Sequence, residues 1–167
     1  MFPCPASLDE AVVQAEKYLL PPPPDGRGRG RSAFGIRLVT DSPLGSAGTL
    51  VGSTSLGEAD VENEKVHLGW TLYGRRWWGT PVNPESKLLL LAHCFDDCHL
   101  GRVKIQTDSI NRHSAGAIRK LGAVEEGTAR RDIRRADGSF RDSLVFSILA
   151  DEWPGVRSRL LDRIGRV

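Results

Sequence analysis

The amino-acid sequence predicts an α/β (α+β) fold in which a mixed, mostly antiparallel sheet carries helices on both faces. Residues 66–73 form an apolar strand-like run, residues 88–95 a helix-like run, and residues 102–107 an alternating strand. A strand, a helix and a strand in this order favour a central parallel pair with a right-handed crossover. Hairpin-like patterns on both sides of this unit favour antiparallel edges.

The elements before the crossover unit follow from capping and turn residues. Ser7 with Glu10 three residues later is a capping box, so a helix is expected over residues 7–20. Strand-like runs at 33–40 and 49–56 flank a turn-rich segment, which predicts a hairpin.

The later elements follow from similar signals. Gly122 stands where a left-handed helix cap is expected, and Asp137-Gly138 indicates a hairpin turn. These elements are an acidic loop at 57–65, a helix at 86–97, a helix at 112–121, strands at 126–135 and 139–149, and a short helix at 157–164.

Composition indicates one domain of ordinary size. The chain has 167 residues, 40% of them hydrophobic, and a net charge of only +2. We expect a single domain over residues 1–167, with a flexible Pro/Gly/Arg loop at 21–32 and a tail at 154–167. The low net charge makes a nucleic-acid partner unlikely for the molecule as a whole, although arginines gather in three places along the chain.

The three cysteines, Cys4, Cys94 and Cys98, have no framework spacing, which favours reduced thiols and a cytoplasmic protein. The chain start lacks the pattern of a signal peptide, and no run has the apolar length of a membrane span. Cys94 and Cys98 share a helix face with nearby histidines, but there is no second ligand pair at a recognised spacing. We therefore expect no metal site.

The stretch 74–87 has the chemistry of an anion-binding turn. It links the strand at 66–73 directly to a helix, whose first turn offers unpaired N–H groups and a positive dipole end. Arg75 and Arg76 add positive charge just upstream. Asn83 is expected to cap the helix, with Pro84 and Glu85 in its first turn. This pattern predicts a ligand with a pyrophosphate group.

Within that stretch, Arg76-Trp77-Trp78-Gly79-Thr80-Pro81 resembles the acyl-CoA-binding signature of the GNAT N-acetyltransferase superfamily. The signature has Gln or Arg, two variable residues, Gly, one variable residue, then Gly or Ala, so Pro81 departs from it. The surrounding segments resemble the branch that acetylates ribosomal-protein N-termini (RimJ/RimL-type). These segments are His67-Leu68-Gly69-Trp70, Val82 to Lys87, Asp108 to Ser114, Ala117 to Ala123, and Asp137 to Asp142.

The resemblance implies acetyl-CoA as the cofactor and a sheet whose central parallel pair splays apart around the pantetheine arm. The pyrophosphate is expected on backbone N–H groups between Trp78 and Asn83, and the acyl oxygen on the N–H of Leu72. Asn111 and Ser114 match residues that contact the pantetheine arm and the sulfur. The expected cofactor-binding residues are Arg76, Trp77, Trp78, Gly79, Thr80, Val82, Asn83, Lys87, Asn111 and Ser114.

The implied reaction is direct attack of a primary amine on the thioester, which needs a base and a donor to the leaving thiolate. His67 is the first candidate base because imidazole titrates near working pH. Glu62 and Glu64 are alternative bases, and Ser114 is the candidate donor. An exposed strand histidine without a role, solvated acidic residues and a serine bonded to its own helix are the plainer interpretations.

The sequence therefore favours an N-acetyltransferase that acts on a protein N-terminus or a small amine, without naming the acceptor. Relative to the family pattern, the first strand and first helix are missing from the chain as given. We expect an open acceptor site, or one that a partner chain completes, as in a homodimer. The alternative is a non-catalytic acyl-CoA-binding module with an incomplete acceptor site.

Overall fold

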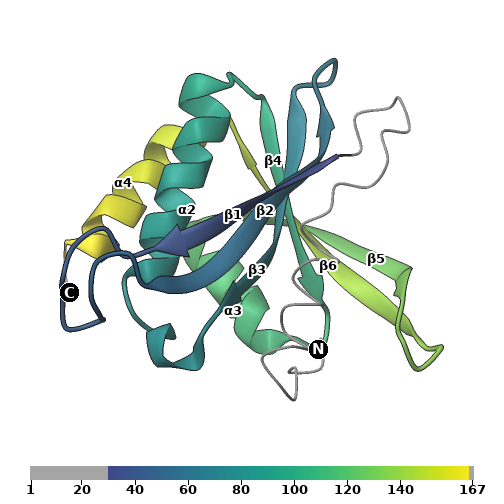
Figure 1. Ribbon diagram of the computed structural model, residues 1–167. Helices are drawn as coiled ribbons and strands as arrows, with labels where there is room; N and C mark the ends of the chain where they lie inside the picture. Colours follow the sequence, from purple (N-terminus) through teal and green to yellow (C-terminus); the bar gives the residue numbers. More distant parts are fainter. Residues whose placement is uncertain (1–29, 166–167) are drawn as a thin grey trace.

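The computed structural model describes residues 30–165, which form a sheet covered by helices (Figure 1). The strands in this part are ordered β1-β2-β3-β4-β6-β5, with β3 and β4 parallel and the other neighbours antiparallel. The elements are β1 Arg31–Arg37, β2 Leu50–Asp60, β3 Lys65–Tyr73, η1 Arg75–Trp77, α2 Val82–Ala92, η2 His93–Asp97, β4 Arg102–Asp108, α3 Arg112–Leu121, β5 Val124–Arg134, β6 Phe140–Leu149 and α4 Trp153–Ile164. The mixed, mostly antiparallel sheet is therefore confirmed.

The three α-helices of the described region pack on one face of the sheet. Alternate strand positions such as Leu68 on β3 and Phe146 on β6 are fully buried. They join one apolar cluster with Leu91 of α2, Ile118 of α3 and Leu160 of α4. The helix expected over residues 7–20, which would supply a second layer, lies outside the described residues.

The opposite face of the central strands is polar. Between the core positions of β3, β4 and β6 lie His67, Lys104 and Ser147, which alternation turns to the other side of the sheet. His67 and Ser147 are nevertheless buried. A buried polar face of this kind suits a binding surface better than a second apolar layer.

The central parallel pair is short, and the two strands part beyond it. β3 and β4 pair only from Lys65 opposite Arg102 to His67 opposite Lys104. A β-bulge follows on β3, where Trp70 has a φ of 50° and the register with β2 shifts. The splayed pair expected from the family resemblance is therefore present, with His67 at its closed end.

Several expected boundaries differ from the structure. The acidic loop is shorter than expected because β2 continues to Asp60. The crossover helix starts at Val82 rather than at residue 86 and ends in a π-helical turn, η2. Asn83 is not its cap: Pro81 holds that position without a side-chain hydrogen bond, and Pro84 lies inside the first turn. The terminal helix, α4, begins at Trp153, earlier than predicted.

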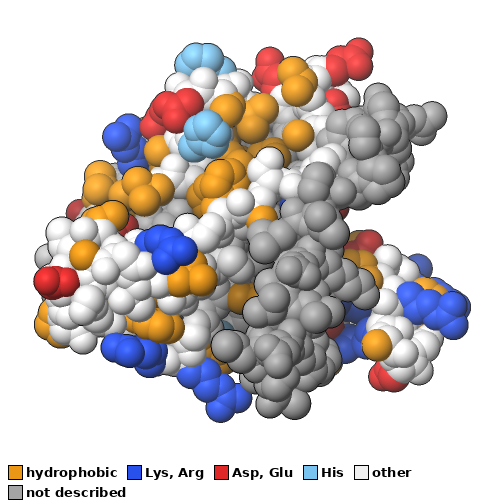
Figure 2. Space-filling model, viewed as in Figure 1, with side chains coloured by type: hydrophobic (Ala, Val, Ile, Leu, Met, Phe, Trp, Pro, Cys, Tyr) orange, Lys and Arg blue, Asp and Glu red, His pale blue; other side chains and the backbone are white. Residues whose placement is uncertain are grey.

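The hairpin of β5 and β6 extends away from α2 and α4 (Figure 1). Its turn contains Gly138, with a φ of 85°, as the Asp137-Gly138 pair predicted. Lysine and arginine side chains gather on this projecting hairpin (Figure 2). No helix within residues 30–165 is both long and apolar enough to cross a membrane.

Candidate functional site

The candidate donor site starts at the turn between β3 and α2. Gly79 adopts a φ of 76°, and a Cβ built there would meet no atom within 4 Å. The open space beside a left-handed glycine lets a ligand approach the backbone closely. Thr80 Oγ1 donates to Trp77 O at 2.7 Å, which holds the turn closed.

Four N–H groups in this turn have no backbone acceptor among the described residues: those of Gly79, Thr80, Val82 and Asn83. Val82 N contacts only Thr80 Oγ1, at 3.4 Å. Trp78 differs, because its N–H already donates to Arg75 O at 3.1 Å. The first turn of α2 therefore presents the unpaired donors and the positive dipole end that bind anions.

Arg76 and Trp77 brace the turn from the side. The Arg76 guanidinium lies 4.8 Å from the centre of the Trp77 ring. Both side chains donate to Leu44 O, from Arg76 Nη2 at 3.0 Å and from Trp77 Nε1 at 3.1 Å. These contacts tie the turn to the connection between β1 and β2, so both residues position the backbone as well as adding charge.

Lys87 lies on the inner side of α2, which contradicts the expectation that it contacts phosphate. Its side chain is 5% exposed. Nζ donates to Thr71 Oγ1 at 2.8 Å and to Thr54 Oγ1 at 3.2 Å. Burial lowers the pKa of Lys87 to about 7. The residue therefore connects the helix behind the anion turn to β2 and β3.

The N–H of Leu72 points toward β2, not toward the splayed gap. Gly74 N donates to Val51 O at 3.1 Å, and Gly52 lies opposite Tyr73. Because facing residues of an antiparallel ladder alternate in direction, the N–H of Leu72 faces β2 and that of Tyr73 faces the side that β4 has left. Sequence reasoning chose the neighbouring residue, since the bulge at Trp70 is not visible in a strand pattern.

His67 is held in a polar cluster at the closed end of the gap. It is 4% exposed, and its Nδ1 lies 3.3 Å from Glu58 Oε1. Glu58 Oε2 accepts from Lys104 Nζ at 2.5 Å. Burial, together with the positive charge of Lys104, lowers the pKa of His67 to about 4, although Glu58 acts in the opposite direction.

His67 Nε2 is a buried nitrogen without a hydrogen-bond partner within the described part of the chain. Nδ1–H donating to Glu58 leaves the lone pair on Nε2. A Cβ at Gly69 would lie 2.8 Å from Nε2, so glycine makes room for the ring. The Trp70 ring lies 4.8 Å from the ring of His67. An unpaired acceptor of this kind is available to a ligand.

Glu58 is the carboxylate that sequence reasoning missed. Glu62 and Glu64 lie in the turn between β2 and β3, where Glu64 O accepts from Gly101 N and Arg102 N. Glu58 was read as part of the same loop. Its position on β2, one residue past Gly57 opposite His67, was predictable only from the register of the two strands.

Asn111 and Ser114 form the start of α3. Asn111 is the N-cap, and its Oδ1 accepts from Ser114 N at 3.0 Å. The neighbouring His113 ring stacks on Trp78, with ring centres 5.0 Å apart. Trp78 Nε1 also donates to Tyr73 O at 3.0 Å. The start of α3 is thus brought to the end of β3 and to the anion turn.

Comparison with protein families was made against this geometry. The model of the acetyltransferase (GNAT) domain matches residues 2–124, which is more than half of the chain. The chain belongs to the GNAT acetyltransferase family. The turn, the bulge and the splayed parallel pair therefore belong to a GNAT sheet.

Relatives of this GNAT chain support the assignment. It is 30% identical over 108 residues to "Putative ribosomal N-acetyltransferase YdaF" of Bacillus subtilis (strain 168), a match that covers 65% of this chain and 58% of that protein. It is 28% identical over 106 residues to "Uncharacterized N-acetyltransferase p20" of Bacillus licheniformis, covering 64% of this chain. Each match spans 58% of the curated relative's length.

Solved structures share the whole described fold. A crystal structure of an acetyltransferase from T. thermophilus superposes with a TM-score of 0.79 at 34% identity, covering 98% of this chain and 80% of that one. The structure of Mycobacterium smegmatis RimJ in complex with CoA-disulfide superposes with a TM-score of 0.67 at 24% identity, covering 93% of this chain and 66% of that one. At that identity the second likeness concerns the fold alone.

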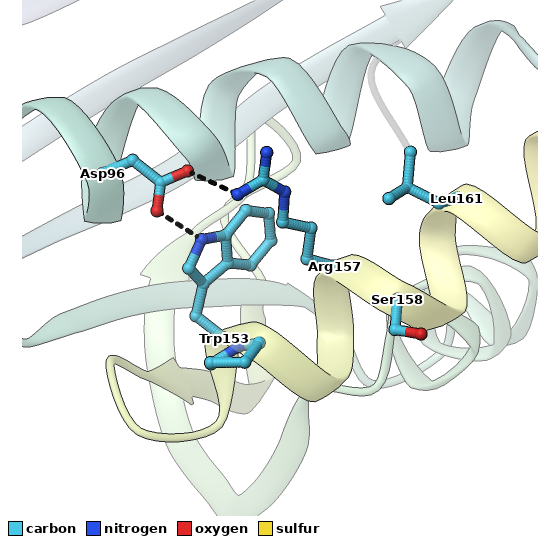
Figure 3. A pocket seen from close by; sticks show the side chains of 6 residues that line it. Asp96, Trp153, Arg157, Ser158 and Leu161 are labelled. Atoms are coloured by element: carbon cyan, nitrogen blue, oxygen red, sulfur yellow. Dashed lines mark hydrogen bonds and ion pairs between the residues drawn. The ribbon is translucent and has the colours of Figure 1, made fainter.

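A surface hollow between η2 and α4 lies at the other end of α2 from the GNAT turn (Figure 3). Asp96 accepts there from Trp153 Nε1 at 2.8 Å and pairs with Arg157 at 3.5 Å. Its remaining lining residues are Pro154, Ser158 and Leu161. The hollow anchors α4 to the end of α2 and takes no part in the donor site.

Proposed function

We propose that this chain is an acetyl-CoA-dependent N-acetyltransferase that moves the acetyl group to a primary amine by direct attack. The observation that carries the proposal is the anion turn before α2, with its four N–H groups lacking backbone acceptors in the described part of the chain. It opens beside the gap left by β4, at whose closed end His67 holds an unpaired nitrogen.

The turn fits the pyrophosphate of acetyl-CoA. The N–H groups of Gly79, Thr80, Val82 and Asn83 would hold it, and the open space at Gly79 admits it. The N–H of Tyr73 replaces Leu72 as the proposed donor to the acyl oxygen. Ser114, in the first turn of α3, is the proposed donor to the sulfur. Acetyl-CoA supplies the acetyl thioester.

His67 is the proposed base. Glu58 holds Nδ1–H, so Nε2 faces the acceptor amine with its lone pair. A pKa near 4 keeps the imidazole neutral at the pH where a primary amine loses its proton. Nε2 therefore orients the amine and accepts its proton, and Lys104 holds Glu58 in place.

The acceptor class and the assembly are proposed from the relatives. YdaF is named for ribosomal N-acetyltransfer, and p20 for N-acetyltransfer. A protein N-terminus and a small amine present the same nucleophile, and both suit the polar face around Glu58. We also propose a cytoplasmic homodimer, because β1 and β5 end the sheet as edge strands. A monodisperse monomer at high protein concentration would contradict the dimer.

Release of CoA thiol from acetyl-CoA tests the proposal, measured with a panel of peptides and small amines. The wild-type chain is expected to release thiol with at least one amine, and His67→Gln to release it more slowly while still binding acetyl-CoA. Binding of acetyl-CoA without thiol release across the panel would favour the non-catalytic module instead.

A further inference from the structure

A cysteine, a histidine and an aspartate meet at the end of α2, outside the donor site. Cys98 Sγ lies 3.6 Å from His93 Nε2. The other ring nitrogen, His93 Nδ1, lies 3.0 Å from Asp97 Oδ2. The contacts follow the order of nucleophile, base and orienting group that marks an activated nucleophile.

The π-helical turn η2 explains how these three side chains meet. Cys98 N donates to His93 O at 3.0 Å, a bond that spans five residues. This turn is wider than an α-helical turn, so residues four and five positions later both lie over His93. In a regular α-helix, positions three and four residues apart are neighbours instead. Sequence reasoning paired Cys94 with Cys98 for that reason.

The geometry fixes the roles of the three side chains. Asp97 can only accept from His93 Nδ1–H when ionised, which leaves the lone pair of the imidazole on Nε2. Nε2 then faces the thiol of Cys98 and accepts its proton. The thiolate is the reactive form of cysteine, and a nearby base raises its population.

The two cysteines of the described region differ in access. Cys98 is exposed, whereas Cys94 is buried. Burial raises the pKa of the Cys94 thiol to about 12. Histidine and acidic side chains gather at the top of the view in Figure 2, over the end of α2 and opposite the anion turn. Within residues 30–165, no three His, Cys, Asp or Glu side chains are arranged to hold a metal ion.

We propose that Cys98 is a modification site that reacts with small disulfides, with His93 as the base and Asp97 as a positioning residue. His93 Nε2 takes the thiol proton, and Cys98 Sγ attacks one sulfur of the disulfide. A new S–S bond to Cys98 forms as the old one breaks, and the departing thiolate takes up the proton. The products are a mixed disulfide on Cys98 and one free thiol.

A disulfide fits this site better than a thioester does. In-line exchange at sulfur needs a thiolate and access, and it develops no oxyanion. Attack on a thioester carbonyl would need hydrogen-bond donors aimed at the developing oxyanion. The site lies far along α2 from the donor turn, so its reactivity is independent of acetyl transfer.

The test is the rate at which glutathione disulfide modifies the full chain at neutral pH without acetyl-CoA. Peptide mass spectrometry separates mixed disulfides on Cys98, Cys94 and Cys4. His93→Gln is expected to slow reaction at Cys98 by about tenfold or more, and Asp97→Asn to slow it less. His99→Gln, which changes the histidine next to Cys98 in the chain, is the matched control and is expected to react at the wild-type rate.

Two results would overturn the proposal. One is equal modification of Cys98 in His93→Gln and His99→Gln. The other is a wild-type Cys98 that reacts no faster than an unstructured cysteine peptide of the same sequence. Circular dichroism of each variant distinguishes a slower reaction from a lost fold, because Cys98 in an unfolded chain would match the peptide.

Discussion

Lys87 Nζ lies 2.8 Å from Thr71 Oγ1, so a buried lysine of α2 is bonded to the strand segment just past the bulge. Thr54 on β2 completes the contact at 3.2 Å. The same helix begins at the anion turn, five residues before Lys87. One side chain therefore joins the proposed pyrophosphate site to the strand that carries the proposed acyl site at Tyr73.

Replacing Lys87 with methionine is expected to raise stability and weaken donor binding. The buried amine loses its desolvation cost, while Thr54 and Thr71 still bond each other at 2.8 Å. We expect the melting temperature to rise by about 3 °C or more, measured by calorimetry. The Kd for acetyl-CoA is expected to rise, because the link between α2 and β3 is lost. Lys120→Met, at an exposed lysine of α3, is the control. A Lys87→Met variant that is less stable yet binds acetyl-CoA normally would contradict both expectations.

Lys87 also predicts a pH dependence of stability. Its pKa falls from 10.5 in the unfolded chain to about 7 in the folded protein, so the unfolded state binds more protons between these values. The free energy of unfolding is therefore expected to rise as pH increases from 7 toward 10.5. Urea unfolding across this window measures it. The rise should shrink in Lys87→Met, and an identical pH slope in the variant would contradict a buried amine.

His67 predicts where the pH profile of catalysis has no inflection. With a pKa of about 4, His67 stays neutral across the neutral range. The fall of kcat/KM at low pH is then expected to follow the acceptor amine, without a separate inflection near the ordinary histidine pKa of about 6.5. Kinetics with two acceptors of different amine pKa measure this. An inflection near that value with both acceptors, absent from His67→Gln, would show that the imidazole titrates normally.

Glu58 and Gly69 are expected to act through His67. Glu58→Gln removes the carboxylate that holds Nδ1–H, and Gly69→Ala crowds Nε2 at 2.8 Å. Both variants should lower kcat by about tenfold or more and leave acetyl-CoA binding near the wild-type value. Calorimetric titration separates the two effects. Loss of binding and kcat in equal measure would assign both residues to folding of the sheet instead.

Trp78 and His113 are expected to act as a pair. Their rings stack 5.0 Å apart and join the anion turn to the start of α3. Trp78→Ala and His113→Ala should each weaken acetyl-CoA binding, and the double variant should be little worse than either single one. The coupling comes from calorimetric Kd values of the four proteins. Fully additive losses would mean that the stack does not organise the site.

Much of the fold was readable from the sequence because its signals are local. Gly122 was expected to cap α3 and has a φ of 95°. The alternation of β4 and the turn at Gly138 were equally direct. The start of α2 was misplaced because Asn83 and Pro84 both suit a helix start, and only the structure shows Pro81 at the cap.

The candidate site was less readable because its contacts depend on strand register. The pairing of Glu58 with His67 needs the register of β2 and β3. The choice between Leu72 and Tyr73 depends on a one-residue bulge. Burial of Lys87 depends on which side of α2 faces the sheet, and a helix that is apolar on several faces does not reveal it.

The most direct test of the donor site compares acetyl-CoA binding in Gly79→Glu and Gly48→Glu. Both glycines have a positive φ, 76° and 81°, and a Cβ added to either would meet open space, so the backbone cost is matched. Only Gly79 lies among the N–H groups proposed to hold pyrophosphate. Titration calorimetry is expected to show that Gly79→Glu loses acetyl-CoA binding while Gly48→Glu binds as the wild-type chain does. Equal affinity of the two folded variants would contradict an acetyl-CoA site at this turn.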